Sequence, residues 1–185
     1  IEGNFAMDAV GYNVPQVSAD ANGNYMIPLT MSIDAPTPTS QDIETATITD
    51  VVNIQFDHGI LALPSTYTDE GEPTRLIIFC HGSAKHILPN TQVFPSGAYG
   101  IDPTYWLSEG YAVMDMDGLP NDTTTPHWCV PVAYQCYLAA YRFVVNNYNI
   151  HKEVFLGGRS LGGGIALTIM AKGNIPVVAC CPFAP

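Results

Sequence analysis

Four short apolar runs in the second half of the chain predict strands that are buried on both faces of a sheet. They lack the regular alternation of apolar and polar positions that marks a half-solvated strand, and each is followed by residues typical of turns. The runs are RLIIFC at 75–80, YAVMDM at 111–116, EVFL at 153–156 and IPVVACC at 175–181. Runs of this kind are typical of parallel strands.

Between these runs, apolar positions recur at helical spacing. The longest predicted helix covers 132–148, and a short one covers 103–109. A further helix is predicted over 161–171, although the glycines at 162–164 lower its helix propensity locally. Strands that alternate with helices predict an α/β fold, in which a mostly parallel twisted sheet has helices on both faces.

The N-terminal part of the chain has a different pattern. It begins with a stretch rich in Asn, Pro, Thr and Gly, which predicts extended chain with one strand near 25–31. The run VVNIQFDHGILAL at 51–63 predicts a hairpin or a bent strand, with Gly59 at the turn or bulge. We therefore expect an acidic extended segment at 1–50, a main domain over 51–185, and antiparallel strands at the N-terminal edge of its sheet.

Composition and charge narrow the classes of partner. The chain has 185 residues, of which 47% are hydrophobic, and a net charge of −11. All of the excess negative charge lies in residues 1–74, which hold no Lys or Arg, while residues 75–185 are neutral. This balance argues against nucleic acid and anionic membrane surfaces as partners. An acidic, Thr- and Asn-rich beginning without basic residues favours an extracytoplasmic location, after removal of an export signal.

A G-x-S-x-G pentapeptide, Gly158-Arg159-Ser160-Leu161-Gly162, stands between a predicted strand and a predicted helix. A serine on a very tight strand-to-helix turn needs small residues two positions away on either side. Such a turn raises the hydroxyl above the carboxyl ends of the strands, and the helix directs backbone N–H groups and its positive dipole end at a developing oxyanion. The segment therefore predicts a nucleophilic serine.

A second segment, His81-Gly82-Ser83, follows the RLIIFC strand about 80 residues before this serine. A strand that ends in His-Gly at such a distance from the nucleophile is where an oxyanion donor would come from. A simple strand-to-loop turn is the alternative interpretation of the same residues. No spacing of Cys and His in the chain indicates a metal site, and we expect no cofactor.

The order of these elements resembles the α/β-hydrolase superfamily, in its esterase and serine-peptidase branches. A strand that ends in His-Gly-Ser comes first, and a strand that ends in Asp-Gly, the long helix and the Gly-Arg-Ser-Leu-Gly turn follow it. The resemblance implies that Ser160 is the nucleophile and that the N–H groups of Leu161 and Ser83 form the oxyanion hole. The supporting residues that it implies are His81, Gly82, Gly158 and Gly162. It also implies a small-molecule or carbohydrate-linked ester as the substrate.

The resemblance is incomplete at the C-terminal end. Residues 161–185 contain no Asp, Glu or His, whereas in the family the acid and the histidine of the triad follow the serine. The chain thus resembles the N-terminal part of a hydrolase, and a serine without a base is a poor nucleophile at neutral pH. His127 and His86, on loops at the carboxyl ends of the strands, are candidates for a substitute base.

Three functions stay open from the sequence. In the first, the chain is the nucleophile-bearing part of an ester hydrolase, or, as a variant, of a serine peptidase of the prolyl-oligopeptidase-like type. In the second, it is a catalytically incomplete module for binding or assembly. The third possibility is a short hydrolase that is complete in itself. Because no later strand covers it, Ile175–Cys181 is expected to form an apolar edge, which predicts self-association or pairing with a complementary C-terminal fragment.

Overall fold

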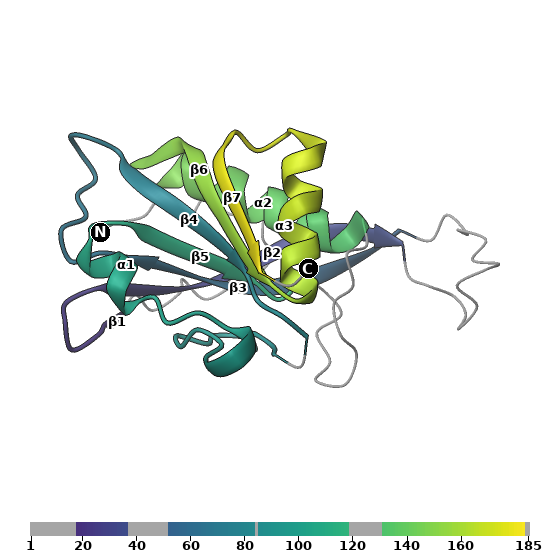
Figure 1. Ribbon diagram of the computed structural model, residues 1–185, viewed down its shortest axis with the longest axis horizontal. Helices are drawn as coiled ribbons and strands as arrows, with labels where there is room; N and C mark the ends of the chain where they lie inside the picture. Colours follow the sequence, from purple (N-terminus) through teal and green to yellow (C-terminus); the bar gives the residue numbers. More distant parts are fainter. Residues whose placement is uncertain (1–17, 37–51, 84, 119–130, 184–185) are drawn as a thin grey trace.

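The computed structural model describes residues 18–36, 52–83, 85–118 and 131–183 (Figure 1). Seven strands from these ranges form one sheet in the order β1-β2-β3-β5-β4-β6-β7. The strands are β1 (Ser18–Ala19), β2 (Tyr25–Pro36), β3 (Val52–Leu63), β4 (Thr74–Cys80), β5 (Ala112–Met116), β6 (Ile150–Arg159) and β7 (Val177–Phe183). The four apolar runs of the sequence are thus all strands, as predicted.

The sheet has a parallel half and an antiparallel half. Strands β5, β4, β6 and β7 are parallel to one another, whereas β1, β2 and β3 pair antiparallel, and β3 joins β5 in antiparallel orientation. The expectation of an α/β fold with antiparallel strands at the N-terminal edge is confirmed. The carboxyl ends of the four parallel strands lie at the same edge of the sheet, which we call the carboxyl edge.

Of the two alternatives for 51–63, a hairpin or a bent strand, the hairpin is wrong, because β3 is one continuous strand that pairs along its whole length with β2. The pairing has no register shift at Gly59, so this glycine stands at neither a turn nor a bulge of the β2–β3 pair. Gly59 lies inside this strand, opposite Met116 of β5. A Cβ on Gly59 would clash with the Met116 sulfur, so close contact between strands is the physical reason for this glycine. Strand β2 belongs to the sheet although it lies in the segment 1–50 that the sequence sets apart.

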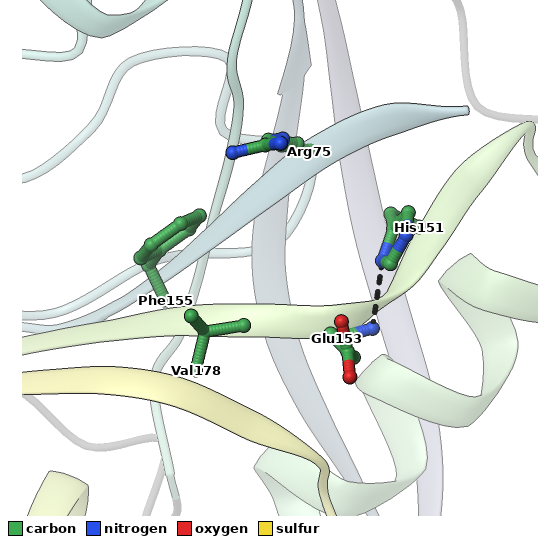
Figure 2. Close-up of a pocket in the computed structure, with 5 residues that line it drawn as sticks. All are labelled: Arg75, His151, Glu153, Phe155 and Val178. Atoms are coloured by element: carbon green, nitrogen blue, oxygen red, sulfur yellow. Dashed lines mark hydrogen bonds between the residues drawn. The ribbon is translucent and has the colours of Figure 1, made fainter. Parts of the chain in front are cut away.

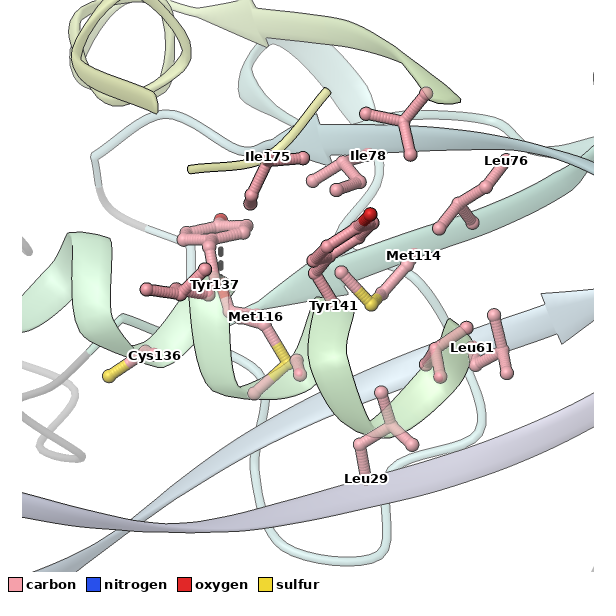
Figure 3. Close-up of a cluster of buried hydrophobic side chains, with 14 of the residues drawn as sticks. Leu29, Leu61, Leu76, Ile78, Met114, Met116, Cys136, Tyr137, Tyr141 and Ile175 are labelled. Atoms are coloured by element: carbon pink, nitrogen blue, oxygen red, sulfur yellow. Dashed lines mark hydrogen bonds between the residues drawn. The ribbon is translucent and has the colours of Figure 1, made fainter. Parts of the chain in front are cut away.

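Two long helices cover one face of the sheet and a short helix covers the other. The helices are α1 (Thr104–Ser108), α2 (Pro131–Asn147) and α3 (Leu161–Lys172), with a 3-10 turn η1 at Gly97–Tyr99. Figure 3 shows Tyr137 and Tyr141 of α2 directed at the sheet, in the larger buried cluster. Leu107 of α1 belongs to the smaller cluster on the opposite face. None of the helices in the described ranges is long and apolar enough to cross a membrane.

Strand β7 forms the open edge of the described sheet. Its sequence, VVACCPF, has the apolar composition of a strand buried on both faces, yet Val178 and Phe183 are each 56% exposed. From the sequence we expect the edge at Ile175–Cys181, and the last strand of the described sheet covers Val177–Phe183. The expected self-association or pairing with a complementary fragment stays a prediction.

Candidate active site

Ser160 lies between the end of β6 and the beginning of α3, in a backbone conformation that residues with a side chain rarely adopt. Its φ is 54° and its ψ is −126°, and it is the N-cap of α3. Such a conformation costs on the order of 1–3 kcal/mol and persists only where the surrounding structure imposes it. The side chain is partly exposed. This is the sharp strand-to-helix turn that the pentapeptide predicts.

The two glycines of the pentapeptide explain how the chain makes this turn. A Cβ on Gly158 would clash with the carbonyl group of Gly162, so the two sides of the turn touch each other. A Cβ on Gly162 would clash with the carbonyl oxygens of Cys80 and His81. The first turn of α3 is therefore pressed against the end of β4, and larger residues at either position would open the turn.

Hydrogen bonds fix the backbone of Ser160 from two sides. Its N–H donates to the carbonyl oxygen of Phe183 over 2.8 Å, which ties the turn to the end of β7. Its carbonyl oxygen accepts the N–H of Gly163 over 2.9 Å in the first turn of α3. Leu161 is the first residue of α3, where backbone N–H groups point toward the N-terminal end of a helix.

The loop after β4 lies beside the serine turn. A Cβ on Gly82 would lie 2.9 Å from the carbonyl oxygen of Arg159 and 3.0 Å from the ring of Tyr99, so the two backbones are in close contact. The N–H of Gly82 donates to the carbonyl oxygen of Tyr99 over 2.7 Å. The structure thus brings the residues next to Ser83 and Ser160 together at the carboxyl edge.

His81 is fully buried and makes an ion pair below this loop. Its Nδ1 lies 3.0 Å from Asp115 Oδ2, and its Nε2 lies 3.1 Å from the carbonyl oxygen of Lys85. Burial disfavours the charged imidazole, but the Asp115 carboxylate outweighs this effect and raises the pKa of His81 above its usual value. His81 therefore holds the loop, and both of its ring nitrogens are engaged there.

Two further buried carboxylates hold neighbouring loops at the same edge. Asp117 Oδ1 accepts the N–H of Ile87 over 2.8 Å. His86 Nδ1 lies 3.3 Å from the same oxygen, which is within ion-pair distance, but the two atoms do not have the geometry of a hydrogen bond. Burial is the main cause that raises the pKa of Asp117. Asp57 accepts the N–H of Gly118 over 3.0 Å. Each carboxylate thus fixes a different piece of backbone.

The sequence pattern did not single out Asp57, Asp115 or Asp117 as site residues. The sequence signal for Asp57 is weak, because the segment 51–63 also contains Asn53, Gln55 and His58, and only the structure shows that Asp57 is fully buried. Burial and this carboxylate raise the pKa of the Cys136 thiol well above its usual value, so the thiol stays protonated. Within the described residues, no group of three or more acids, Cys or His is arranged to hold a metal ion.

The described histidines have partners other than Ser160. His58 contacts Thr30, and His151 accepts the N–H of Glu153 at the opposite end of β6. His86, a candidate base, lies with its Nδ1 against Asp117 at the carboxyl edge. The other candidate base, His127, lies outside the described residues.

A shallow pocket of about 110 Å³ is formed at the amino ends of the parallel strands, at the far end of β6 from Ser160. Figure 2 shows the residues that line it: Arg75, His151, Glu153, Phe155 and Val178. This pocket is not part of the candidate active site, because β6 runs away from it toward the carboxyl edge.

Comparison with known proteins finds similarity in structure only. No protein-family model matches the chain, and no curated protein matches it in sequence. A cold-adapted esterase from an Arctic intertidal metagenomic library superposes on 89% of the chain with a TM-score of 0.54 and 14% identity. The rice cell wall degrading esterase LipA from Xanthomonas oryzae superposes on 86% with a TM-score of 0.56 and 16% identity. Candida antarctica lipase A superposes on 86% with a TM-score of 0.55 and 15% identity.

The chain spans only part of these solved structures. It covers 62% of the Arctic esterase, 42% of LipA and 37% of the Candida lipase. At identities this low, the likeness is one of fold, and the chemistry of this chain has to be argued from its own residues.

Proposed function

We propose that this chain, which has the α/β-hydrolase fold, is the nucleophile-bearing part of a serine hydrolase that cleaves carboxylic esters through an acyl-enzyme on Ser160. One observation carries the proposal: Ser160 has a φ of 54° between a parallel strand and a helix, with a glycine packed tightly on either side of it. A strained backbone at a partly exposed serine is maintained at a cost in stability, which favours a role in chemistry over a role in packing.

In the proposed reaction, Ser160 Oγ attacks the ester carbonyl carbon while its proton passes to a base. The carbonyl oxygen becomes an oxyanion, which the N–H groups of Leu161 and Ser83 stabilise by hydrogen bonds. The alcohol then leaves with a proton, and water hydrolyses the acyl-serine. Gly158 and Gly162 hold the turn, and His81 and Gly82 hold the loop of Ser83.

The base is proposed to come from polypeptide that follows this stretch in the complete enzyme. Residues 161–185 contain no Asp, Glu or His. The similar esterases and lipase are longer than the aligned part, so the fold in those proteins includes more chain than this one supplies. A small-molecule or carbohydrate-linked ester as the substrate, and an extracytoplasmic location, are part of the same proposal.

A second candidate function, a hydrolase complete in this chain, is favoured by one observation. His86 Nδ1 faces the buried Asp117 carboxylate at 3.3 Å. In a catalytic triad the acid holds this nitrogen of the histidine, which leaves Nε2 to accept the serine proton. His86 and Asp117 would then act as base and acid, with His127 as the alternative base.

A fluorophosphonate probe tests these alternatives, with imidazole added as an external base. For the main proposal, we expect labelling of Ser160 that is weak without imidazole, rises with imidazole concentration and is absent in Ser160→Ala. Labelling without imidazole that is lost in His86→Gln would support the self-contained hydrolase instead. A chain that is folded by circular dichroism but unlabelled under both conditions would support a catalytically incomplete binding module.

A further inference from the structure

Asp115 and His81 form a buried pair in which both carboxylate oxygens and both ring nitrogens have polar partners. Both side chains are 0% exposed. Asp115 Oδ2 faces His81 Nδ1 at 3.0 Å, and Oδ1 accepts the Tyr137 hydroxyl and the Met116 N–H, both over 2.9 Å. Burial is the main cause that raises the pKa of Tyr137 far above its usual value, so this hydroxyl stays a donor. The carboxylate is therefore held from β5 and from α2.

Both ring nitrogens of His81 face acceptors. Nδ1 faces the Asp115 carboxylate, and Nε2 faces the carbonyl oxygen of Lys85 at 3.1 Å. A neutral imidazole has one donor and one acceptor nitrogen, so only the doubly protonated ring can donate to both partners. A cationic His81 satisfies both contacts, and the Asp115 carboxylate is then the group that compensates its charge.

The contact from His81 to Lys85 closes the loop that contains Gly82 and Ser83. Gly82 packs against the backbone of Arg159, directly before the serine. A change in the position of the loop would therefore change the distance between the Ser83 amide and Ser160. Rigid placement of oxyanion donors is what makes them effective, because they then need no reorganisation during the reaction.

We propose that Asp115 is a positioning residue, which holds His81 against the carbonyl of Lys85 and thereby fixes the Ser83 amide beside the Ser160 turn. The inference rests on the proposed function, since the position of Ser83 matters only if its amide stabilises an oxyanion. Asp115 itself does not touch the substrate. Asp117, which follows β5, also favours the cationic form of His81, and Cys80 of β4 lies close to Tyr137.

Nuclear magnetic resonance of the chain with 15N-labelled histidine tests this directly. In the wild type we expect two protonated ring nitrogens on His81 at neutral pH, and a Gly82 amide that is protected from hydrogen exchange by its bond to Tyr99. In Asp115→Asn we expect His81 to be neutral at the same pH, and the Gly82 amide to exchange at least tenfold faster. Amides inside β4 and β6, such as those of Ile78 and Val154, should keep their protection. Asp102→Asn, at an exposed carboxylate, is the matched control and should change neither signal.

A neutral His81 in the wild type, or a Gly82 amide whose protection is unchanged in a folded Asp115→Asn, would overturn the inference. If Asp115→Asn does not fold, Tyr137→Phe removes one of the hydrogen bonds to the carboxylate and leaves the ion pair. That variant should weaken the Gly82 protection while His81 stays cationic, and unchanged Gly82 protection would also reject the proposal. The measurement does not use the Ser160 hydroxyl, so its failure is separate from failure of the labelling experiment.

Discussion

The N–H of Ser160 donates to the carbonyl oxygen of Phe183 over 2.8 Å, so the strained turn is tied to the last residue of the edge strand β7. The serine is thus fixed by three neighbours: the end of β7 on one side, the end of β4 on the other, and the helix that follows it. The position of Ser160 therefore depends on contacts between segments that lie far apart in the chain.

Relief of backbone strain at position 160 should stabilise the protein. Ser160→Gly removes the penalty of a side chain at a φ of 54°, whereas Ser160→Ala removes the hydroxyl and keeps the penalty. Strain of about 1–3 kcal/mol outweighs the extra chain entropy of glycine, which is about 0.5–1 kcal/mol. We expect urea unfolding to show Ser160→Gly more stable than Ser160→Ala by about 1 kcal/mol. Equal stabilities would mean that the turn carries no strain.

A methyl group on Gly162 should destabilise the protein more than one on Gly157. At Gly162 the added group meets the carbonyl oxygens of Cys80 and His81, which are backbone atoms and move only if the turn opens. At Gly157 it meets the ring of Phe79 at 3.0 Å, which can shift. We expect Gly162→Ala to lower the free energy of unfolding by about 1–3 kcal/mol or more. Gly157→Ala is the matched control, and a loss as large there would show that the serine turn is not unusually crowded.

Stability should fall with rising pH because of His81. Its pKa is raised in the folded protein, so its contribution is present in full below its unfolded value of about 6.5 and is lost as the pH rises through the folded value. Urea unfolding at a series of pH values from about 6 to 9 should therefore show a declining free energy of unfolding in the wild type. The decline should largely disappear in Asp115→Asn, which removes the charge that holds the proton. If the free energy of unfolding declines just as steeply with pH in this variant, the decline belongs to a titrating group other than His81.

The open edge of β7 should drive the association of two copies of the chain. Val178 and Phe183 are exposed, and no charged residue lies in Val177–Phe183 to oppose pairing with another edge. Val178→Lys places a charge on this edge, and we expect it to reduce concentration-dependent association in size-exclusion chromatography with light scattering. Val93→Lys, at a side chain that is 73% exposed in a loop, is the control and should leave association unchanged. A wild type that is monomeric at all concentrations would contradict the prediction.

The parallel strands, the helices between them and the serine turn could be predicted because their signals are local. An apolar run identifies a strand, and Gly158 and Gly162 are near neighbours in sequence of the serine that they accommodate. The hairpin expected at Gly59 failed for the opposite reason. That glycine is required by Met116, which lies far away in sequence and meets it only because β3 pairs with β5.

By itself, the sequence determined the α/β pattern and the place of Ser160, because hydrophobic periodicity and the size of neighbouring residues act over a few positions. Only the tertiary structure decided that Asp115 pairs with His81, that Asp117 holds Ile87 and that Asp57 holds Gly118. An acid at the end of a strand has the same local pattern whether it faces water or a buried partner. Its role depends on strand order and helix packing, which bring distant polar groups together where water is excluded and an unpaired charge would be costly.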